Sequence, residues 1–320
     1  MRTTGDPAKL CEERLRSIGY TTTHLENRQG SFAAVVYDVF VRGTSGREER
    51  FVYKQPPEDR LGEFALLRDL GAELSPWLPA VVARFEATPR AFLMRYAGEP
   101  LLPPEAVRAA GRTERLSAYE RISAALADLH LRTLPYARQW AREGRASPYA
   151  FSREWADRML RDADGALPSV LAAELSRIVT SFYADYGPSS MRGPETFTHG
   201  DPHIGNALAL DGKLTLIDWE WTNVAAPMRD VAILAMDEPE DALYARIAEA
   251  HADKLVRGGM PATVEALLDD FGRMTVDNAL MTLGWDAALF RRGDTTAREF
   301  AEAAERRLSR LAPFWNRLRR

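Results

Sequence analysis

The sequence has few of the features that mark several large classes of protein. Its 320 residues include a single cysteine, Cys11, which excludes an internal disulfide and a metal site built from several cysteines. No stretch approaches about 18 uncharged apolar residues, so we expect no membrane-spanning helix and no membrane partner. The net charge is only −4, from 42 basic and 46 acidic residues, which argues against a nucleic-acid partner. The first fifteen residues are polar and lack the apolar segment of a secretory signal, so we expect a cytoplasmic protein.

What the chain does contain divides by pattern into two parts. The composition, 46% hydrophobic and 28% charged, is typical of a folded globular protein. A helix is predicted at 7–18, and short runs rich in β-branched and aromatic residues then predict strands, with one short helix at 61–70. The predicted strands cover 31–41, 49–54, 80–87 and 91–96. Helical periodicity takes over from Pro104 and is clearest at 113–131. We therefore expect a boundary near Ala97-Gly98, between a small β-rich part and a larger helical part.

One β-hairpin interrupts the helical part. Two alternating apolar segments, 206–210 and 213–217, flank Asp211-Gly212, and Asp-Gly between such segments is a strong hairpin signal. Counting back from this turn places Asn206 opposite Ile217. Asp218 therefore lies one step from Asn206, at the open end of the hairpin.

Three oxygen-bearing side chains converge at that open end. Asp201 lies in the loop that enters the hairpin, and Asn206 and Asp218 flank its open end. Strict alternation would place Asn206 and Asp218 on opposite faces, so the strand pairing must end or bulge there for both to reach one ion. Oxygen ligands of this kind suit Mg²⁺, and the order Asp, Asn five residues later, then Asp fits the template for phosphoryl transfer. Alternatively, each residue alone would serve as a turn or cap residue.

A second feature lies in the β-rich part. Lys54 ends a predicted strand, where its ammonium could reach the phosphates of a nucleotide. Glu63 opens the next helix on the same side as Leu67 and Leu70, and a carboxylate on an apolar face needs a partner. Lys54 is the obvious candidate, as in kinases. Alternatively, Glu63 is a solvated first-turn residue and Lys54 an edge-strand lysine. A turn at 28–32 contains Gly30 and Ser31, whose backbone N–H groups could meet phosphates, but it is not a G-x-G-x-x-G motif.

Two motifs carry a resemblance to a known family. His199-Gly-Asp-Pro-His-Ile-Gly-Asn206 and Ile217-Asp-Trp-Glu220 resemble the aminoglycoside phosphotransferase family, a broad group that includes antibiotic, choline/ethanolamine, homoserine and fructosamine kinases. Most of the chain shares the resemblance, in segments 52–54, 63–67, 92–101, 126–130 and 227–232. It implies an α+β, protein-kinase-like fold of two lobes. Residues 1–97 would form a nucleotide-binding lobe with a small antiparallel sheet and one regulatory-type helix, and residues 98–320 a mainly helical lobe.

The resemblance also implies roles for individual residues. Asp201 would be the catalytic base, and Asn206 and Asp218 would hold Mg²⁺. Lys54 would contact the phosphates of ATP and pair with Glu63. Met94, Arg95 and Ala97 of the hinge would bind adenine. His199 and His203 of the loop would have structural roles. His130 would be a hydrogen-bonded core residue. GTP is not excluded as the phosphate donor.

The sequence departs from an ordinary protein kinase. Trp-Glu follows Asp218 where protein kinases have Phe-Gly, and no Ala-Pro-Glu segment is present, so we do not expect an activation loop. His203 stands where protein kinases carry lysine, and Ile204 replaces a proline frequent in the family. A pseudokinase is opposed by the intact set of Lys54, Asp201, Asn206 and Asp218.

We expect an ATP- and Mg²⁺-dependent kinase that phosphorylates a hydroxyl of a small molecule, working as a monomer or a homodimer. An antibiotic acceptor is favoured slightly over choline, ethanolamine, an amino alcohol or a sugar. Acidic and aromatic residues of the second part are the candidate acceptor contacts, which include Glu220, Trp221, Asp277 and Trp285. The alternative is that the acidic segment 237–241 is a solvated loop and Trp285 a core residue.

The last fifteen residues, 306–320, are rich in arginine. They could form a basic amphipathic patch for an acidic partner or a membrane surface, or simply a terminal helix with a solvated arginine face.

Overall fold

The computed structural model describes residues 6–28, 35–42, 46–162, 165, 167–236 and 238–319. The chain forms two compact units. Unit 1 comprises Met1–Leu101 with Asn206–Trp221, and unit 2 comprises Leu102–Gly205 with Thr222–Arg320. The hairpin thus clusters with the β-rich segment, because strand β6 (Glu99–Pro100) pairs with its first strand through Glu99 and Ala209. The assignment of two functional lobes stays a prediction.

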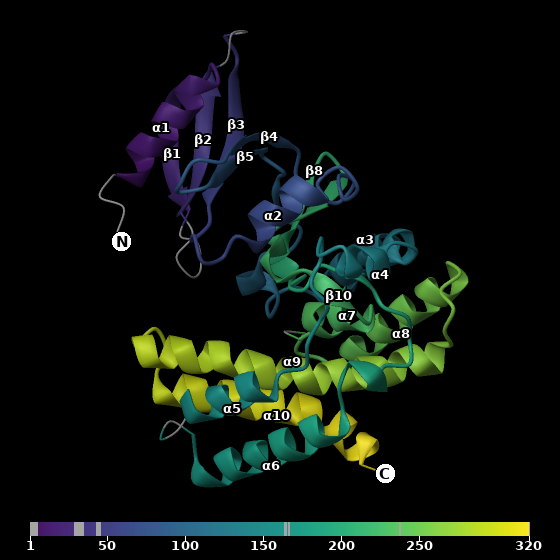
Figure 1. Ribbon diagram of the computed structural model, residues 1–320. Helices are drawn as coiled ribbons and strands as arrows, with labels where there is room; N and C mark the ends of the chain where they lie inside the picture. The colour runs from purple at the N-terminus through teal and green to yellow at the C-terminus, as the bar shows by residue number, and fades with distance from the viewer. Residues whose placement is uncertain are drawn as a thin grey trace. The chain divides into compact units, whose positions relative to one another are not determined.

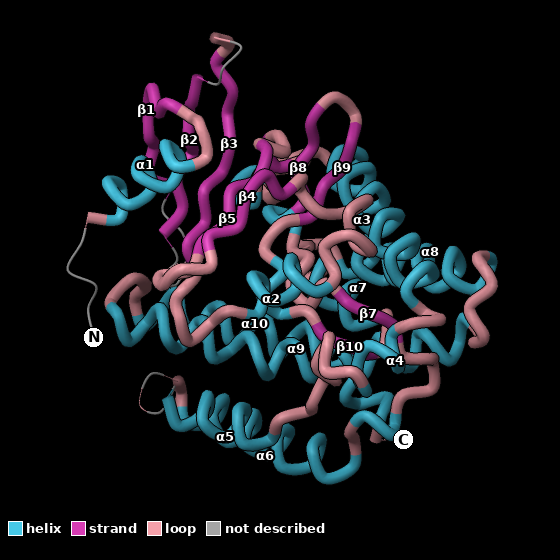
Figure 2. Tube along the Cα trace, turned by 45° about the horizontal axis from the view of Figure 1, so that its top comes forward, coloured by secondary structure: helices cyan, strands magenta, loops and turns pink. Residues whose placement is uncertain are grey.

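Unit 1 is built on an antiparallel sheet with strand order β1-β2-β3-β5-β4 (Figure 2). The strands are β1 (Thr21–Arg28), β2 (Val35–Arg42), β3 (Glu48–Gln55), β4 (Val81–Phe85) and β5 (Ala91–Arg95). Helix α1 (Pro7–Ser17) precedes the sheet, and helix α2 (Gly62–Asp69) follows β3. The predicted strands and helices are confirmed within the described residues, although 31–34 of the first predicted strand lie outside them, and β1 was missed. It is a polar edge strand, Thr-Thr-Thr-His-Leu-Glu-Asn-Arg, with no apolar alternation to reveal it.

One face of the sheet packs against helix α1, and the other faces a cavity. Helix α1 lies beside the strands of unit 1 (Figure 1). Phe51 and Tyr53 are fully buried and pack with Leu15 of this helix. Because side chains alternate along a strand, Val52 and Lys54 point to the opposite face. The sequence of β3 therefore sends one set of side chains into the core and leaves the other set for a cavity.

The hairpin forms as predicted, and its end resolves the conflict over faces. Strands β8 (Ala207–Leu210) and β9 (Lys213–Leu216) pair in the expected register, with Leu210 opposite Lys213. The regular ladder stops at Ala207, and beyond it Ile217 donates its N–H to the carbonyl oxygen of Asn206 at 2.9 Å. Asp218 then adopts φ 64°, in the left-handed region that Asp tolerates better than most residues. Asn206 and Asp218 therefore lie outside the alternation of the strands.

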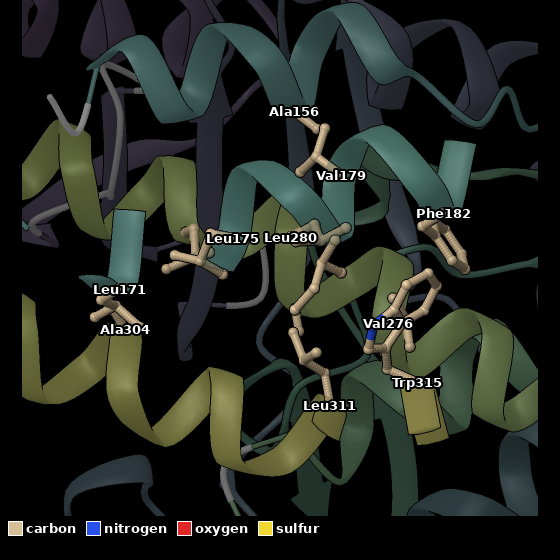
Figure 3. Close-up of a cluster of buried hydrophobic side chains, with 13 residues drawn as sticks. Ala156, Leu171, Leu175, Val179, Phe182, Val276, Leu280, Ala304, Leu311 and Trp315 are labelled. Atoms are coloured by element: carbon tan, nitrogen blue, oxygen red, sulfur yellow. The ribbon is translucent and has the colours of Figure 1, made fainter. Parts of the chain in front are cut away.

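Unit 2 is mainly helical. Its α-helices are α3 (Arg112–Thr133), α4 (Ala137–Arg142), α5 (Arg153–Asp162), α6 (Ser169–Asp185), α7 (Met228–Leu234), α8 (Asp241–Arg257), α9 (Val264–Arg292) and α10 (Ala297–Leu318). A two-stranded sheet, β7 (Thr196–Thr198) with β10 (Asn223–Ala225), brings the segment before the predicted catalytic loop beside the segment after the hairpin. A hydrophobic core of α5, α6, α9 and α10 includes Phe182, Leu280 and Trp315 (Figure 3). Among the described residues, no helix is long and apolar enough to cross a membrane.

The arginine-rich tail belongs to α10. The helix begins with a capping box at Thr296, and its buried residues Leu311 and Trp315 pack into the core. Its arginines are not all solvated, because Arg307 pairs with Asp286 at 2.5 Å and Arg310 lies over the ring of Tyr244. The prediction of a terminal helix is confirmed, but its arginine face is only partly solvated. Packing of the apolar stripe turns part of the basic face inward.

Candidate active site

Unit 1 contains a cavity of about 240 Å³ on the face of the sheet opposite α1. Strand residues Val52 and Lys54 line it, joined by Glu63 of α2 and by Asp218 and Glu220, which follow the hairpin. Its remaining lining is Arg28, Val36, Pro56, Pro57, Arg60, Pro79, Met94, Arg95, Ala97, Leu208 and Ile217. The cavity thus brings together most of the residues predicted to bind a nucleotide.

An ammonium group between two carboxylates is the main polar feature of this cavity. The Nζ of Lys54 lies 2.5 Å from Oε2 of Glu63 and 2.8 Å from Oδ1 of Asp218. The other oxygen of Glu63, Oε1, accepts the backbone N–H of Trp219 at 3.3 Å. The predicted pairing of Lys54 with Glu63 is therefore present, and it ties strand β3 to helix α2 and to the end of the hairpin.

The charges of this cluster support one another. Burial alone would lower the pKa of Lys54, but the adjacent carboxylates of Glu63 and Asp218 outweigh it, and the pKa is raised. The two carboxylates thus favour the charged form of Lys54. For Glu220 the balance is different, since burial and the nearby Asp218 raise its pKa against the opposing effect of Arg60. Glu220 was predicted to contact the acceptor, yet it lines the same cavity as Lys54.

The end of strand β5 and the residues that follow it line the cavity. Met94, Arg95 and Ala97 all line it, as predicted for an adenine-binding hinge. The N–H of Arg95 donates to the carbonyl oxygen of Ala80 at 2.8 Å, so the carbonyl of Arg95 is the group that could meet an adenine amino group. Apolar Val36, Val52, Met94 and Leu208 could sandwich a planar ring, as is usual in small-molecule sites.

The donor set at the end of the hairpin fits Mg²⁺. Asn206 offers an amide oxygen and Asp218 a carboxylate, both hard oxygen ligands. Among the described residues, no three His, Cys, Asp or Glu side chains are placed to hold a metal ion. Two protein oxygens supplemented by the phosphates of a ligand are the usual arrangement for Mg²⁺ rather than a cage of side chains.

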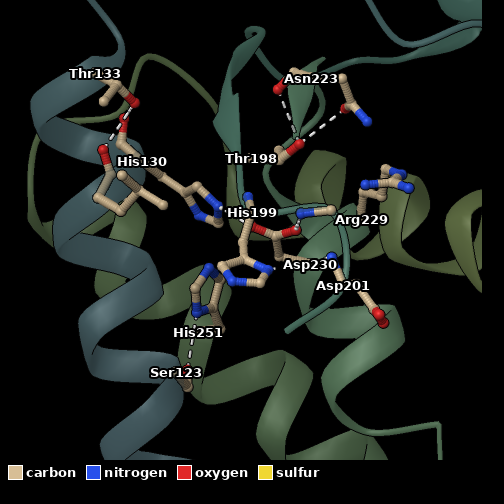
Figure 4. A network of polar contacts seen from close by, with 12 residues as sticks. Ser123, His130, Thr133, Thr198, His199, Asp201, Asn223, Arg229, Asp230 and His251 are labelled. Carbon is tan, nitrogen blue, oxygen red and sulfur yellow. Dashed lines mark hydrogen bonds and ion pairs between the residues drawn. The ribbon is translucent and has the colours of Figure 1, made fainter. Parts of the chain in front are cut away.

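In unit 2, a buried carboxylate holds the predicted catalytic loop. Asp230 of α7 accepts the backbone N–H groups of His199 at 2.8 Å and Gly200 at 2.9 Å, and its Oδ2 lies 3.0 Å from Nε2 of His130 (Figure 4). Burial alone would raise the pKa of Asp230, but its hydrogen bond with His130 lowers it overall. The backbone N–H of Asp201 then donates to Nδ1 of His199 at 3.2 Å. Hydrogen bonds to the fully buried carboxylate of Asp230 thus hold the main chain that carries Asp201.

A second buried histidine lies behind this loop. Nδ1 of His251, in α8, lies 2.8 Å from Oγ of Ser123. The rings of His251 and His130 pack edge to face, with 5.5 Å between their centroids. Burial, reinforced by His130, lowers the pKa of His251 to about 3. His130 is fully buried and hydrogen-bonded, which confirms its prediction as a core residue.

The remaining predicted residues are scattered. Asp277 is fully buried, and its carboxylate accepts hydrogen bonds from Tyr183 at 2.7 Å and from Tyr149. Trp221 is exposed, and Nδ1 of the partly buried His203 accepts the N–H of Gly205. Gly30 and Ser31 lie outside the described residues, as does the side chain of Trp285.

The acidic segment 237–241 is not simply a solvated loop. Glu238 is buried and pairs with Arg115 at 3.0 Å, whereas Asp237 lies outside the described residues. Asp201 belongs to unit 2, and Asn206 and Asp218 to unit 1, so their convergence stays a prediction.

Sequence reasoning did not identify the function of Asp230. The segment 227–232 was noted only as part of a resemblance, and no local pattern shows that one aspartate binds the N–H groups of residues 31 and 30 positions earlier. The only signals in the sequence were His130, a histidine in a helix with an apolar face, and Asp230, an acidic residue in an apolar segment.

Comparisons with known proteins agree with this geometry. Residues 37–266, more than half of the chain, match the phosphotransferase enzyme family (APH). No curated protein matches the sequence significantly.

Among solved structures, the choline kinase LicA from Streptococcus pneumoniae is similar, with a TM-score of 0.65, 15% identity, and 96% of this chain and 99% of that chain covered. A choline/ethanolamine kinase family protein from Mesorhizobium loti has a TM-score of 0.58 at 20% identity and covers 96% and 94%. The macrolide 2'-phosphotransferase MphH from Brachybacterium faecium has a TM-score of 0.56 at 18% identity and covers 92% and 97%.

These structures confirm the predicted kinase-like α+β fold, and the family match confirms the predicted enzyme class, a small-molecule phosphotransferase. The chain belongs to the phosphotransferase enzyme family.

Proposed function

We propose that this protein transfers the γ-phosphate of ATP to a hydroxyl group of a small molecule, with Mg²⁺ as the metal. The observation that carries the proposal is Lys54 held between Glu63 and Asp218. The cavity around it is lined by apolar side chains and by the predicted hinge residues Arg95 and Ala97. A fixed cation beside a candidate metal ligand is what a triphosphate requires.

In this proposal each group has one task. The carbonyl of Arg95 and the N–H of Ala97 would bind the adenine, and Lys54 would bind the phosphates. Asn206 and Asp218 would hold Mg²⁺, which supplies positive charge at the phosphates when bound. Asp201 would orient the acceptor hydroxyl and take its proton as the oxygen forms a bond to the γ-phosphorus. The bond from that phosphorus to the β,γ-bridging oxygen breaks, and ADP leaves with the electron pair.

The experiment tests Asp201 as the catalytic base. ADP formation is measured with ATP and Mg²⁺ across aminoglycosides, macrolides, choline, amino alcohols, sugars and hydroxy acids, with GTP as a second donor. We expect one class of acceptor to stimulate turnover and Asp201→Asn to lower kcat by about 10²- to 10⁴-fold, since general-base catalysis contributes about that much. ATP binding should be unchanged.

Asp211→Asn, in the turn of the same hairpin, is the matched control and should keep full activity, because Asn also tolerates the left-handed conformation found there. If ATP binds but no acceptor stimulates turnover, and Asp201→Asn changes nothing, the protein is a nucleotide-binding protein and not a kinase.

A further inference from the structure

A second cavity, of about 700 Å³, lies within unit 2 and adjoins the loop that carries Asp201. His203 and Ile204 of that loop line it. Four arginines contribute to the rest of its wall, Arg108 from the segment before α3 and Arg306, Arg307 and Arg310 from α10. The arginine-rich end of the sequence is thereby brought beside the predicted catalytic loop.

The carboxylates of this cavity already have arginine partners. Asp286 forms two hydrogen bonds with Arg307, at 2.5 and 3.2 Å. Arg310 lies 3.3 Å from Asp241 and also donates to the carbonyl oxygen of Glu238. The buried carboxylate of Glu238 pairs with Arg115, which is not among the residues that line the cavity.

Two guanidinium groups remain. Among the described residues, neither Arg108 nor Arg306 has a carboxylate or hydrogen-bond partner, and both are exposed at the cavity. A cavity with paired carboxylates and unpaired arginines attracts anions and repels cations.

We propose that this cavity binds the acceptor and that the acceptor carries an oxyanion, a carboxylate or a phosphate, besides the hydroxyl that is phosphorylated. This inference rests on the proposed function. Arginine suits the task because its planar fork donates two parallel hydrogen bonds to an oxyanion. A polycationic aminoglycoside or a quaternary ammonium would instead need free carboxylates or an aromatic cage. In this cavity each of the described carboxylates, Glu238, Asp241 and Asp286, already lies beside an arginine.

The first experiment compares acceptors that differ in charge. ADP formation is measured with glycerate and glycerol 3-phosphate against glycerol, with gluconate against glucose, and with choline as the cation. We expect the acidic member to be preferred, and the two glycerol derivatives to distinguish carboxylate from phosphate. Arg108→Gln and Arg306→Gln should each raise KM for that acceptor roughly tenfold with little change in kcat, as the loss of a hydrogen bond to a charged group predicts.

The control lies on the same helix. Arg298 of α10 pairs with Glu302, and its side chain is 88% exposed, outside the cavity. Arg298→Gln should leave KM unchanged. If glycerol, glucose or choline is phosphorylated as well as the acids, and the cavity variants keep the wild-type KM, the anionic acceptor is wrong while the kinase stands.

A second measurement decides the case in which no acceptor works. Inorganic phosphate is titrated calorimetrically into the Lys54→Met/Glu63→Leu variant, whose nucleotide site lacks its lysine without leaving the buried Glu63 carboxylate uncompensated. We expect binding that weakens at least tenfold when Arg108→Gln and Arg306→Gln are added. Binding that is absent, or that ignores both arginines, overturns the inference. If no acceptor stimulates ADP formation but phosphate binding depends on Arg108 and Arg306, the result counts against the proposed function alone.

Discussion

Lys54 illustrates how one residue serves both stability and function. It neutralises Glu63, whose side chain is only 4% exposed, and it also contacts Asp218. A buried carboxylate whose partner is removed stays uncompensated, which is more costly than losing both charges together. The effect of Lys54 on folding can therefore be separated from its effect on phosphate binding.

We predict that Lys54→Met destabilises unit 1 by about 3–5 kcal/mol and lowers turnover at least a hundredfold. The double variant Lys54→Met/Glu63→Leu should recover most of the stability, because it removes the buried carboxylate of Glu63 together with the ammonium, and Asp218, which also loses Lys54, has a side chain that is 36% exposed. It should remain inactive. Denaturant unfolding and ADP formation measure the two effects. Recovery of activity in the double variant would show that Lys54 acts only through the fold.

At the scale of elements, short contacts decide where the strands can pair. Gly98 precedes β6 at φ +102°, and a Cβ atom there would lie 2.0 Å from the carbonyl oxygen of Ala209 in β8. Only glycine permits this close approach of two backbones. The pairing of β6 with β8, which joins the hairpin to the rest of unit 1, depends on it.

Gly98→Ala should destabilise the protein by about 3 kcal/mol or more, from backbone strain and steric overlap together. Gly46→Ala is the matched comparison, since Gly46 has φ +73° but a Cβ atom added there would meet nothing within 4 Å. It should cost only about 1–2 kcal/mol, the strain alone. Thermal unfolding of both variants checks the difference, and equal shifts in Tm would rule out the backbone contact as its cause.

At the scale of the whole molecule, acid stability depends on the buried cluster of unit 2. The pKa of His251 is about 3 in the folded protein and near 6.5 when unfolded, so the unfolded chain binds more protons between these values. Folding stability contributed by neutral His251 is complete above pH 6.5 and is lost as the pH falls. The lowered pKa of Asp230 acts in the same direction below about pH 4, where the unfolded carboxylate is protonated.

We predict a loss of about 1.4 kcal/mol per pH unit from this histidine between pH 6.5 and pH 4. His251→Gln should make the pH dependence shallower by that amount, whatever its effect at neutral pH. Denaturant unfolding at a series of pH values is the measurement, and parallel curves for wild type and His251→Gln would contradict the prediction.

The sequence by itself determined the order of the elements and the chemistry of the site. Runs rich in β-branched and aromatic residues predicted strands β2 to β5, the Asp-Gly turn predicted the register of β8 with β9, and the apolar face of α2 predicted a partner for Glu63. These features are local, because each follows from residues adjacent along the chain.

Only the tertiary structure decided the features that join distant residues. The polar strand β1 is held by pairing with β2 rather than by its own pattern, and Asp230 reaches His199 across thirty residues. Likewise, the periodicity of α10 predicts a helix, but only packing of Leu311 and Trp315 fixes which arginines turn toward Asp286 and the cavity. Orientation within a fold comes from packing against distant side chains, which no local sequence pattern records.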